Sequence, residues 1–194
     1  MRGVEQIPWL YDLGMVASEA TGFARWRRWL VAGARGRVLE VGCGTGRNLP
    51  LHPAGAEVTA VDPHPENLAR ARRRRPSARL LLAKAEALPF PDASFDTVLL
   101  SLVLCSVEEP AAALREVHRV LAPGGTLRAI EHVRATAPWR ARLQDAVQPS
   151  WTRVSGGCRP NRDSEAAVAK AGFTVLERHA SGLLRRLVAR VRPP

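Results

Sequence analysis

Three glycines at alternate positions follow a short apolar stretch near residue 40. The stretch from Val38 to Val41 leads directly into Gly42, Gly44 and Gly46. Glycine lets the backbone turn sharply and lets a ligand approach it closely. A loop of this kind that ends a strand and opens a helix can hold an anionic group with its free backbone N–H groups. The pattern therefore predicts a nucleotide-type cofactor site.

Three kinds of nucleotide site use a glycine-rich loop, and the residues after the glycines separate them. A dinucleotide fingerprint GxGxxG needs Gly or Ala at position 47, where this chain has Arg47. A P-loop needs Gly-Lys followed by Ser or Thr, and no such triplet occurs in the sequence. The remaining pattern is a GxGxG loop preceded by an acidic residue. We expect cofactor contacts from this loop and its flanks, namely Glu40, Gly42, Cys43, Gly44, Thr45, Gly46 and Asn48.

A carboxylate ends the next apolar stretch, which runs from Val58 to Asp62, sixteen residues after Gly46. A carboxylate at the end of the second strand can accept hydrogen bonds from both hydroxyls of a ribose. We predict this role for Asp62, and the alternative is an N-cap for the helix that follows. Pro63 either flanks an adenine ring or serves as a turn residue.

Further candidates follow the third and fourth predicted strands, because ligands of parallel sheets bind beyond the carboxyl ends of the strands. Ala85 and Glu86 come after the third of these strands, and Ser101 and Leu102 come after the fourth. We expect all four to contact the cofactor. The apolar residues from Leu102 to Leu104 can also be read as plain core.

The alternation of apolar stretches with helical patterns predicts one doubly wound α/β domain with a mostly parallel sheet covered on both faces. We expect residues 1–36 to form an N-terminal helical cap and residues 37–194 to form the main domain. Predicted helices cover 19–33, 65–75, 111–121, 139–151 and 163–171. Predicted strands cover 37–41, 57–61, 80–83, 95–100, 126–130, 173–178 and 187–191.

The net charge of +11 comes almost entirely from arginine, since the chain has only two lysines among 29 basic residues. One interpretation is that arginine is simply the basic residue used on every solvated face. The other is that the basic surface attracts nucleic acid or an anionic membrane. No apolar run reaches the roughly 18 residues of a membrane-spanning helix. The N-terminus lacks the features of a signal peptide, so a cytoplasmic location is expected.

The three cysteines, Cys43, Cys105 and Cys158, are far apart in the sequence and form no CxxC pair. Closely spaced cysteine pairs are the usual sequence sign of a zinc site or a disulfide framework. We therefore expect no metal, no disulfide and a reducing compartment.

From Val38 to Gly125 the chain resembles the class I methyltransferases, in particular the branch with ubiquinone-biosynthesis and small-molecule enzymes. The resemblance implies S-adenosylmethionine as cofactor and S-adenosylhomocysteine as product. It also implies a Rossmann-like seven-stranded sheet with an antiparallel last strand. Many family members carry Asp-Ala after the third strand, whereas this chain has Lys84, Ala85 and Glu86.

Later motifs resemble the animal microsomal alkyl-thiol methyltransferases and their bacterial relatives. The resemblance extends to about Gly172 and implies methyl transfer to small apolar thiols. Animal members carry a hydrophobic N-terminal anchor that we do not expect here. The motifs lie at Leu102 to Val107, Leu114 to Val117, Arg119 to Leu121, Pro123 to Gly125, Glu131 to Val133, Trp139, Gln144, Pro149, Trp151 and Gly157 to Cys158.

Methyl transfer from a sulfonium depends mainly on positioning and desolvation, and a thiol acceptor needs only deprotonation. His132, after the fifth predicted strand, is our candidate for the base, and a structural histidine is the alternative. We expect the acceptor pocket to include Tyr11, Cys105, Glu131, Trp151 and Cys158, each of which can also be ordinary packing.

Other acceptors stay open. A lipid or another small molecule methylated on nitrogen or oxygen would share the cofactor site. An RNA-directed enzyme or binder would use the basic surface, but no Asn-Pro-Pro-Tyr-like motif follows the fourth strand. The helix with Trp26 and Trp29 either lies on a membrane surface or, as we favour, packs on the sheet or over the cofactor pocket.

Overall fold

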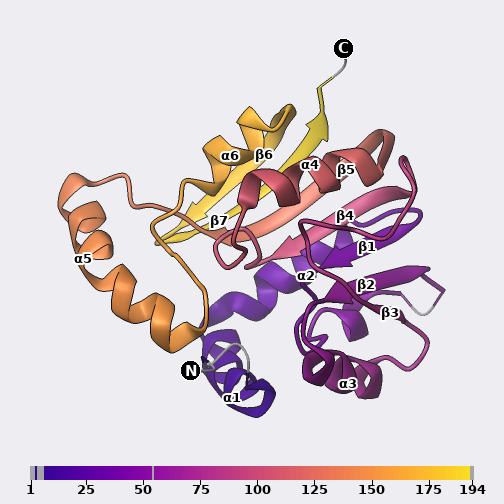
Figure 1. Ribbon diagram of the computed structural model, residues 1–194, viewed down its shortest axis with the longest axis horizontal. Helices are drawn as coiled ribbons and strands as arrows, with labels where there is room; N and C mark the ends of the chain where they lie inside the picture. The colour runs from indigo at the N-terminus through magenta and orange to yellow at the C-terminus, as the bar shows by residue number, and fades with distance from the viewer. Residues whose placement is uncertain (1–2, 4–6, 54, 193–194) are drawn as a thin grey trace.

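A seven-stranded sheet forms the centre of the computed structural model, which describes residues 3, 7–53 and 55–192 (Figure 1). The strand order is β3-β2-β1-β4-β5-β7-β6. Neighbouring strands pair in parallel from β3 to β5, and β7 is antiparallel to both β5 and β6. The mostly parallel sheet with a reversed last strand is therefore confirmed. The strands are Val38–Val41 (β1), Val58–Asp62 (β2), Arg79–Leu82 (β3), Phe95–Ser101 (β4), Leu121–His132 (β5), Phe173–Ser181 (β6) and Leu184–Val191 (β7).

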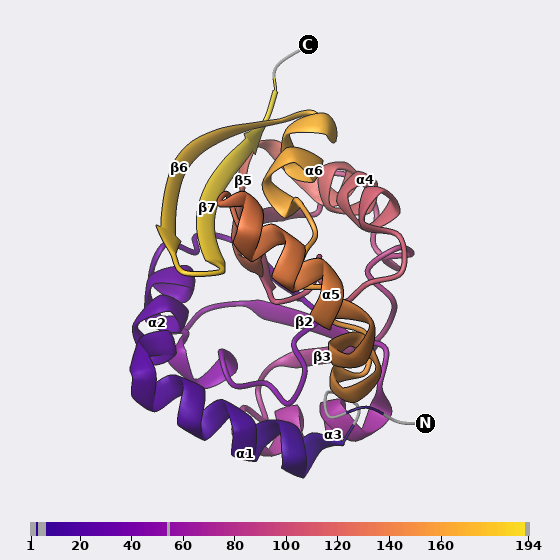
Figure 2. The same cartoon turned by 90° about the vertical axis from the view of Figure 1, so that its left-hand side faces the viewer.

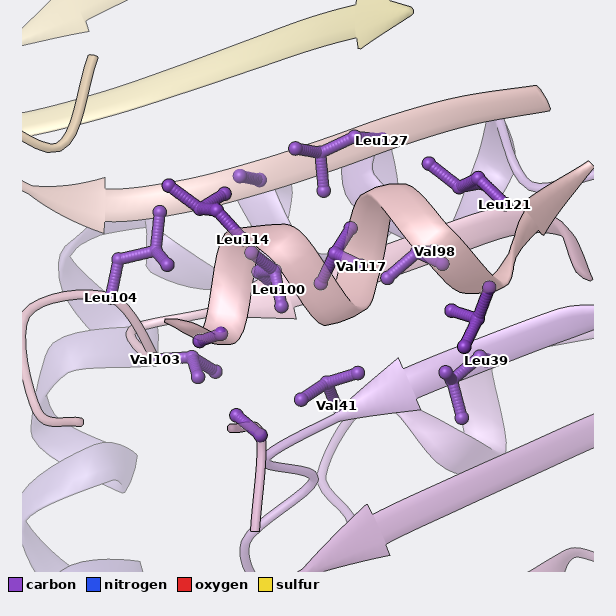
Figure 3. Close-up of a cluster of buried hydrophobic side chains, with 14 of the residues drawn as sticks. Leu39, Val41, Val98, Leu100, Val103, Leu104, Leu114, Val117, Leu121 and Leu127 are labelled. Carbon is purple, nitrogen blue, oxygen red and sulfur yellow. The ribbon is translucent and has the colours of Figure 1, made fainter. Parts of the chain in front are cut away.

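One face of the sheet is covered by α4 (Pro110–Val120) and α6 (Ser164–Lys170). The buried side chains of α4 recur at helical spacing, so one stripe of the helix faces the strands. Figure 3 shows Leu114 and Val117 of this stripe beside Leu100 of β4 and Leu127 of β5. All four side chains are almost fully buried, and this layer is the main core of the domain.

The opposite face carries α1 (Pro8–Ser18), α2 (Ala24–Ala32) and α3 (Pro65–Arg74). The single helix predicted for residues 19–33 was wrong at its start. A π-helical turn at Glu19–Phe23 joins α1 to α2, and inside it Gly22 has a φ of 112°. That left-handed value breaks the α-helical geometry and favours glycine.

The two tryptophans of α2 pack on the sheet, as we favoured. The guanidinium of Arg186 from β7 lies over both Trp26 and Trp29, and that of Arg128 from β5 lies 4.3 Å from the ring centroid of Trp29. Cation–π contacts of this kind attract the tryptophan rings to the arginine side chains of the strands. This pair is therefore part of a packed layer of the fold.

Helix α5 (Pro138–Ser155) is longer than predicted and stands at one side of the sheet (Figures 1 and 2). It ends at Gly156, which has a left-handed φ of 100°. Its large apolar side chains are mostly exposed, in contrast with those of α4. These are Trp139, Leu143, Val147, Trp151 and Val154. Among the described residues, none of the helices has the length and apolar character needed to span a membrane.

Candidate cofactor site and a cysteine-histidine cluster

A cavity of about 440 Å³ opens at the carboxyl ends of the parallel strands. This is the edge where doubly wound sheets bind ligands. Its wall combines the glycine loop, the ends of β2 to β4, the segment after β4 and the segment after α5. The lining residues are Tyr11, Gly42, Gly44, Asp62, Pro63, His64, Asn67, Lys84, Ala85, Glu86, Ser101, Leu102, Val103, Ser106, Val107, Glu108, Gly156, Gly157 and Arg159.

The glycines of the loop serve different purposes. Gly42, Gly44 and Gly46 have φ values of 65°, 55° and 79°. These values lie in the left-handed region, which residues with a side chain rarely adopt. A Cβ atom on Gly46 would lie 2.7 Å from the Cα of Ala71, so this glycine lets the loop pack on α3. A Cβ atom on Gly44 would meet nothing within 4 Å. Gly44 therefore presents bare backbone to the cavity, where a ligand can approach it.

Asp62 lies on the cavity wall with both carboxylate oxygens engaged. Oδ2 accepts a hydrogen bond from the Gly44 N–H at 2.8 Å, and Oδ1 accepts from the His64 N–H and the Asn67 side-chain amide. Burial raises the pKa of Asp62 in spite of these three donors. Because a carboxylate can accept about four hydrogen bonds, Oδ2 keeps capacity for a ligand hydroxyl.

Two polar atoms on the cavity wall are buried and have no hydrogen-bond partner within the described part of the chain: Oδ1 of Asn67 and Oγ of Ser101. Buried polar groups are normally paired, and an exception needs an explanation. A polar ligand in the cavity would supply the partners. The bare backbone at Gly44, the acceptor at Asp62 and these two atoms fit a nucleoside with a charged tail.

Several predicted cofactor residues lie away from the cavity wall. Glu40 is buried in β1, where it accepts a hydrogen bond from the Asn48 side chain at 2.8 Å, and Asn48 in turn accepts one from Arg27 at 2.7 Å. These hydrogen bonds connect β1 and α2 to Asn48, just after the glycine loop. Five of the predicted residues do not line the cavity, and for them direct contact with the cofactor stays a prediction. They are Glu40, Cys43, Thr45, Gly46 and Asn48.

The other predicted cofactor residues all line the cavity, as does Tyr11 of the predicted acceptor pocket. Sequence reasoning missed His64, Asn67 and Lys84, although Lys84 lies two residues after the end of β3 and Asn67 lies in the first turn of α3, five residues after Asp62. It also missed the segment Ser106–Glu108 and, in the segment Gly156–Arg159, the lining residues Gly156, Gly157 and Arg159 on either side of Cys158, which it had assigned to the acceptor pocket. The position of these last two segments depends on long-range packing, so no local pattern indicated it.

Glu131 lies behind the cavity wall. Its carboxylate accepts hydrogen bonds from the backbone N–H groups of Val103, Leu104 and Cys105 at 2.9 to 3.2 Å. Complete burial raises the pKa of Glu131 to about 7, although the three N–H donors act to lower it. Glu131 therefore holds the loop after β4 in place, a role that the sequence did not indicate.

His132, the predicted base, lies beside two cysteines. Its Nδ1 is 3.6 Å from Sγ of Cys105 and 3.5 Å from Sγ of Cys158, and the two sulfurs are 3.7 Å apart. The hydrogen bond with Cys105 lowers the pKa of the Cys158 thiol, and the nearby His132 acts in the same direction. Burial acts in the opposite direction but does not outweigh them. These three residues and Trp151 are not among the lining residues of the cavity. Their predicted roles as base and pocket wall stay untested.

The N-terminal helices are tied to the glycine loop by ion pairs. The Asp12 carboxylate of α1 lies 3.1 Å from Arg47 and 2.9 Å from Arg74 of α3. Glu19 pairs with the same Arg47 and with Arg27. Arg47, which excludes a dinucleotide loop, thus connects α1 to the edge of the cofactor cavity.

Comparison with known proteins decides the family. A family described as a methyltransferase domain matches residues 39–129. Human thiol S-methyltransferase TMT1A is 33% identical over 176 residues, which cover 87% of this chain and 72% of that protein. The chain belongs to the S-adenosylmethionine-dependent methyltransferases. It is an enzyme of this family, and its cofactor is S-adenosylmethionine.

Other comparisons agree with this membership. Rat thiol S-methyltransferase TMT1B is 38% identical to this methyltransferase over 149 residues, which cover 72% of the chain and 61% of that protein. A crystal structure of a SAM-dependent methyltransferase from Thermotoga maritima superposes with a TM-score of 0.67 at 22% identity. The alignment covers 89% of this chain and 96% of that one, and it supports the fold.

Proposed function

We propose that this methyltransferase acts on a small apolar acceptor and that the acceptor class is a thiol. The observation that carries the proposal is the similarity to two thiol S-methyltransferases over most of the chain. The cavity supports it, because Leu102, Val103 and Val107 give the wall after β4 an apolar character. An apolar wall suits an acceptor that carries little charge of its own.

The cofactor, when bound, supplies an electrophilic methyl group on a sulfonium sulfur. Asp62 and Asn67 would hold the ribose hydroxyls, and Gly44 would lie against the ligand with its backbone. Ser101 and Leu102 would face the methionine end, since they lie at the end of β4 and just after it on the same wall. The chain then needs to hold the acceptor lone pair within about 3–3.5 Å of the methyl carbon and to exclude water.

The N-terminal cap, residues 1–36 in our division, would close the acceptor side of this cavity. Tyr11 of α1 lines the cavity, and the pairs from Asp12 and Glu19 hold the helix on the loop. His132 stays a predicted general base for the thiol. Its Nδ1 contacts two sulfurs, so a proton from the acceptor would have to reach the ring at Nε2.

The test is an acceptor panel scored by release of S-adenosylhomocysteine. It contains small aliphatic thiols, their alcohol and amine counterparts, and vesicles of a lipid with an ethanolamine headgroup. We expect turnover with the thiols that exceeds turnover with the matched alcohols and amines. Turnover with the vesicles alone would favour a lipid amine acceptor. Release that is no higher with thiols than without acceptor would contradict the thiol proposal and leave the family unchanged.

A further inference from the structure

The sulfur atoms of Cys105 and Cys158 and Nδ1 of His132 form a small triangle of soft ligand atoms. All ligand atoms of the three residues lie within 4.8 Å of one another. Both cysteines are almost fully buried, and His132 is partly exposed. We propose that this triangle binds a zinc ion through two thiolates and one imidazole. Zinc on Nδ1 leaves the ring proton of His132 on Nε2, so in this proposal His132 is a metal ligand and does not serve as the general base considered above.

The edges of the triangle match the size of a zinc site. Tetrahedral zinc with Zn–S near 2.3 Å and Zn–N near 2.05 Å requires about 3.8 Å between two sulfurs and about 3.6 Å between sulfur and nitrogen. The observed S···S distance is 3.7 Å, and the two S···N distances are 3.6 and 3.5 Å. The three atoms therefore already lie at the separations that a shared zinc ion requires.

The fold holds the two cysteines by backbone contacts that do not involve the triangle itself. The Cys105 N–H donates to Glu131, and the Cys105 carbonyl accepts from the Arg159 N–H at 2.7 Å. The Cys158 N–H donates to the Ser155 hydroxyl, and the Cys158 carbonyl accepts from Thr152. A site whose ligands are positioned in advance binds its metal with a smaller loss of chain entropy.

The ligand types favour zinc. Two thiolates and an imidazole in tetrahedral geometry suit zinc, whereas magnesium and calcium prefer oxygen ligands. Three protein ligands leave the fourth position to water or to an added thiol. His132 is the one ligand of the three that is partly exposed to solvent.

The ion would also connect three segments around the cofactor cavity. Cys105 belongs to the loop after β4, His132 ends β5, and Cys158 follows α5. Three of the four immediate neighbours of the two cysteines line the cavity, namely Ser106, Gly157 and Arg159. A bound zinc would therefore fix the wall that these neighbours form. We expected no zinc site because the sequence has no CxxC pair, but the fold brings together cysteines that lie 53 residues apart.

The decisive experiment measures metal binding by the full chain, purified under reducing conditions. We expect one zinc per protein by elemental analysis, and a cobalt–thiolate charge-transfer absorption when cobalt replaces zinc. Cys105→Ser, Cys158→Ser and His132→Gln should each weaken zinc binding by at least about a hundredfold, because losing a ligand costs more than losing a supporting contact. Far-UV circular dichroism and S-adenosylmethionine binding report whether each variant folds.

The third cysteine provides the matched control. Cys43 is buried in a different cluster, so Cys43→Ser should keep one zinc and the cobalt spectrum. Zinc should also protect two of the three thiols from alkylation in the folded wild type. The proposal is overturned if the reduced wild type binds no stoichiometric zinc. It is also overturned if Cys43→Ser loses as much metal as the other variants, or if Cys105 and Cys158 form a disulfide at the same rate with and without zinc.

Discussion

At the residue scale, Asp62 shows how a buried carboxylate can serve a ligand. Three donors from the chain already hold it, and burial opposes its ionisation. The side chain is therefore fixed in orientation before a ligand arrives, and it still accepts hydrogen bonds. Fixed acceptors of this kind give affinity at a low entropic cost.

Replacing Asp62 with Ala should weaken S-adenosylmethionine binding by at least about tenfold, since each hydrogen bond to a charged group contributes about 1.5–3 kcal/mol. Isothermal titration calorimetry measures the change. Asp92→Ala is the matched control, because that carboxylate is exposed and is not among the residues that line the cavity. Equal affinity of the Asp62 and Asp92 variants would contradict the ribose role.

The pH dependence of binding should reveal the same carboxylate. The pKa of Asp62 lies above its ordinary value of 3.8 in the fold, so cofactor affinity should fall as the pH decreases toward that raised value. Its own contribution to folding has the opposite sign, because protonation removes a charge that is costly to bury. Calorimetry at a series of pH values tests this, with thermal melts as the control for folding. An affinity that is constant down to the pH where the domain unfolds would contradict it.

At the element scale, the position of α1 depends on carboxylates that need to be ionised. Burial opposes the ionisation of Asp12, yet its hydrogen bonds with Arg74, Thr45 and Arg47 lower its net pKa, and the Arg47 hydrogen bond lowers the pKa of Glu19. Lowered pKa values mean that this stabilisation is fully present above the ordinary carboxyl pKa and is lost progressively as the pH falls from there through the lowered pKa values of the folded state. The contact between α1 and the glycine loop should therefore weaken in acid.

Arg47→Ala should release α1 locally while the sheet stays folded. We expect faster amide hydrogen exchange in residues 8–18 and little change in β4 and β5, since local opening follows the loss of local contacts. Arg28→Ala, an exposed arginine in α2, serves as the control. Unchanged exchange in α1 of the Arg47 variant would show that apolar packing alone holds the helix.

Helix α5 shows a limit of reasoning from apolar periodicity. Its apolar residues recur at helical spacing from Trp139 to Trp151, as they do in a core helix, yet the side chains are exposed. Spacing determines that the residues share a face, but it does not determine what the face packs against. The tryptophans of α2, which suggested a helix on a membrane surface as one alternative, pack instead against arginines of the strands.

At the scale of the whole molecule, stability depends on the layer between α4 and the sheet. Leu114→Ala should lower the free energy of unfolding by about 2–5 kcal/mol, because the side chain is fully buried and leaves a cavity. Urea denaturation measures the change. Leu143→Ala is the matched control on the exposed side of α5 and should change stability by less than about 0.5 kcal/mol. Similar losses in both variants would mean that α5 contributes as much to the core as α4.

The sequence by itself determined the features that depend on local order along the chain. The glycine loop, Asp62 and the alternation of strands and helices are local patterns, and they were sufficient to predict the doubly wound sheet and most of the cavity wall. Parallel strands have their carboxyl ends at one edge, so residues that follow different strands could be placed together from the sequence alone.

Only the tertiary structure decided which distant side chains meet. Glu131 binds the loop after β4, Asp12 reaches Arg47 and Arg74, and Cys105 meets Cys158 across 53 residues. Such contacts depend on how helices and loops pack around the sheet, and packing is not periodic along the chain. For that reason the cofactor side of the cavity was predictable, whereas the contacts that support its other wall were not. The family resemblance assigned Cys105, His132 and Cys158 to one acceptor site, but only the tertiary structure showed that the three side chains contact one another.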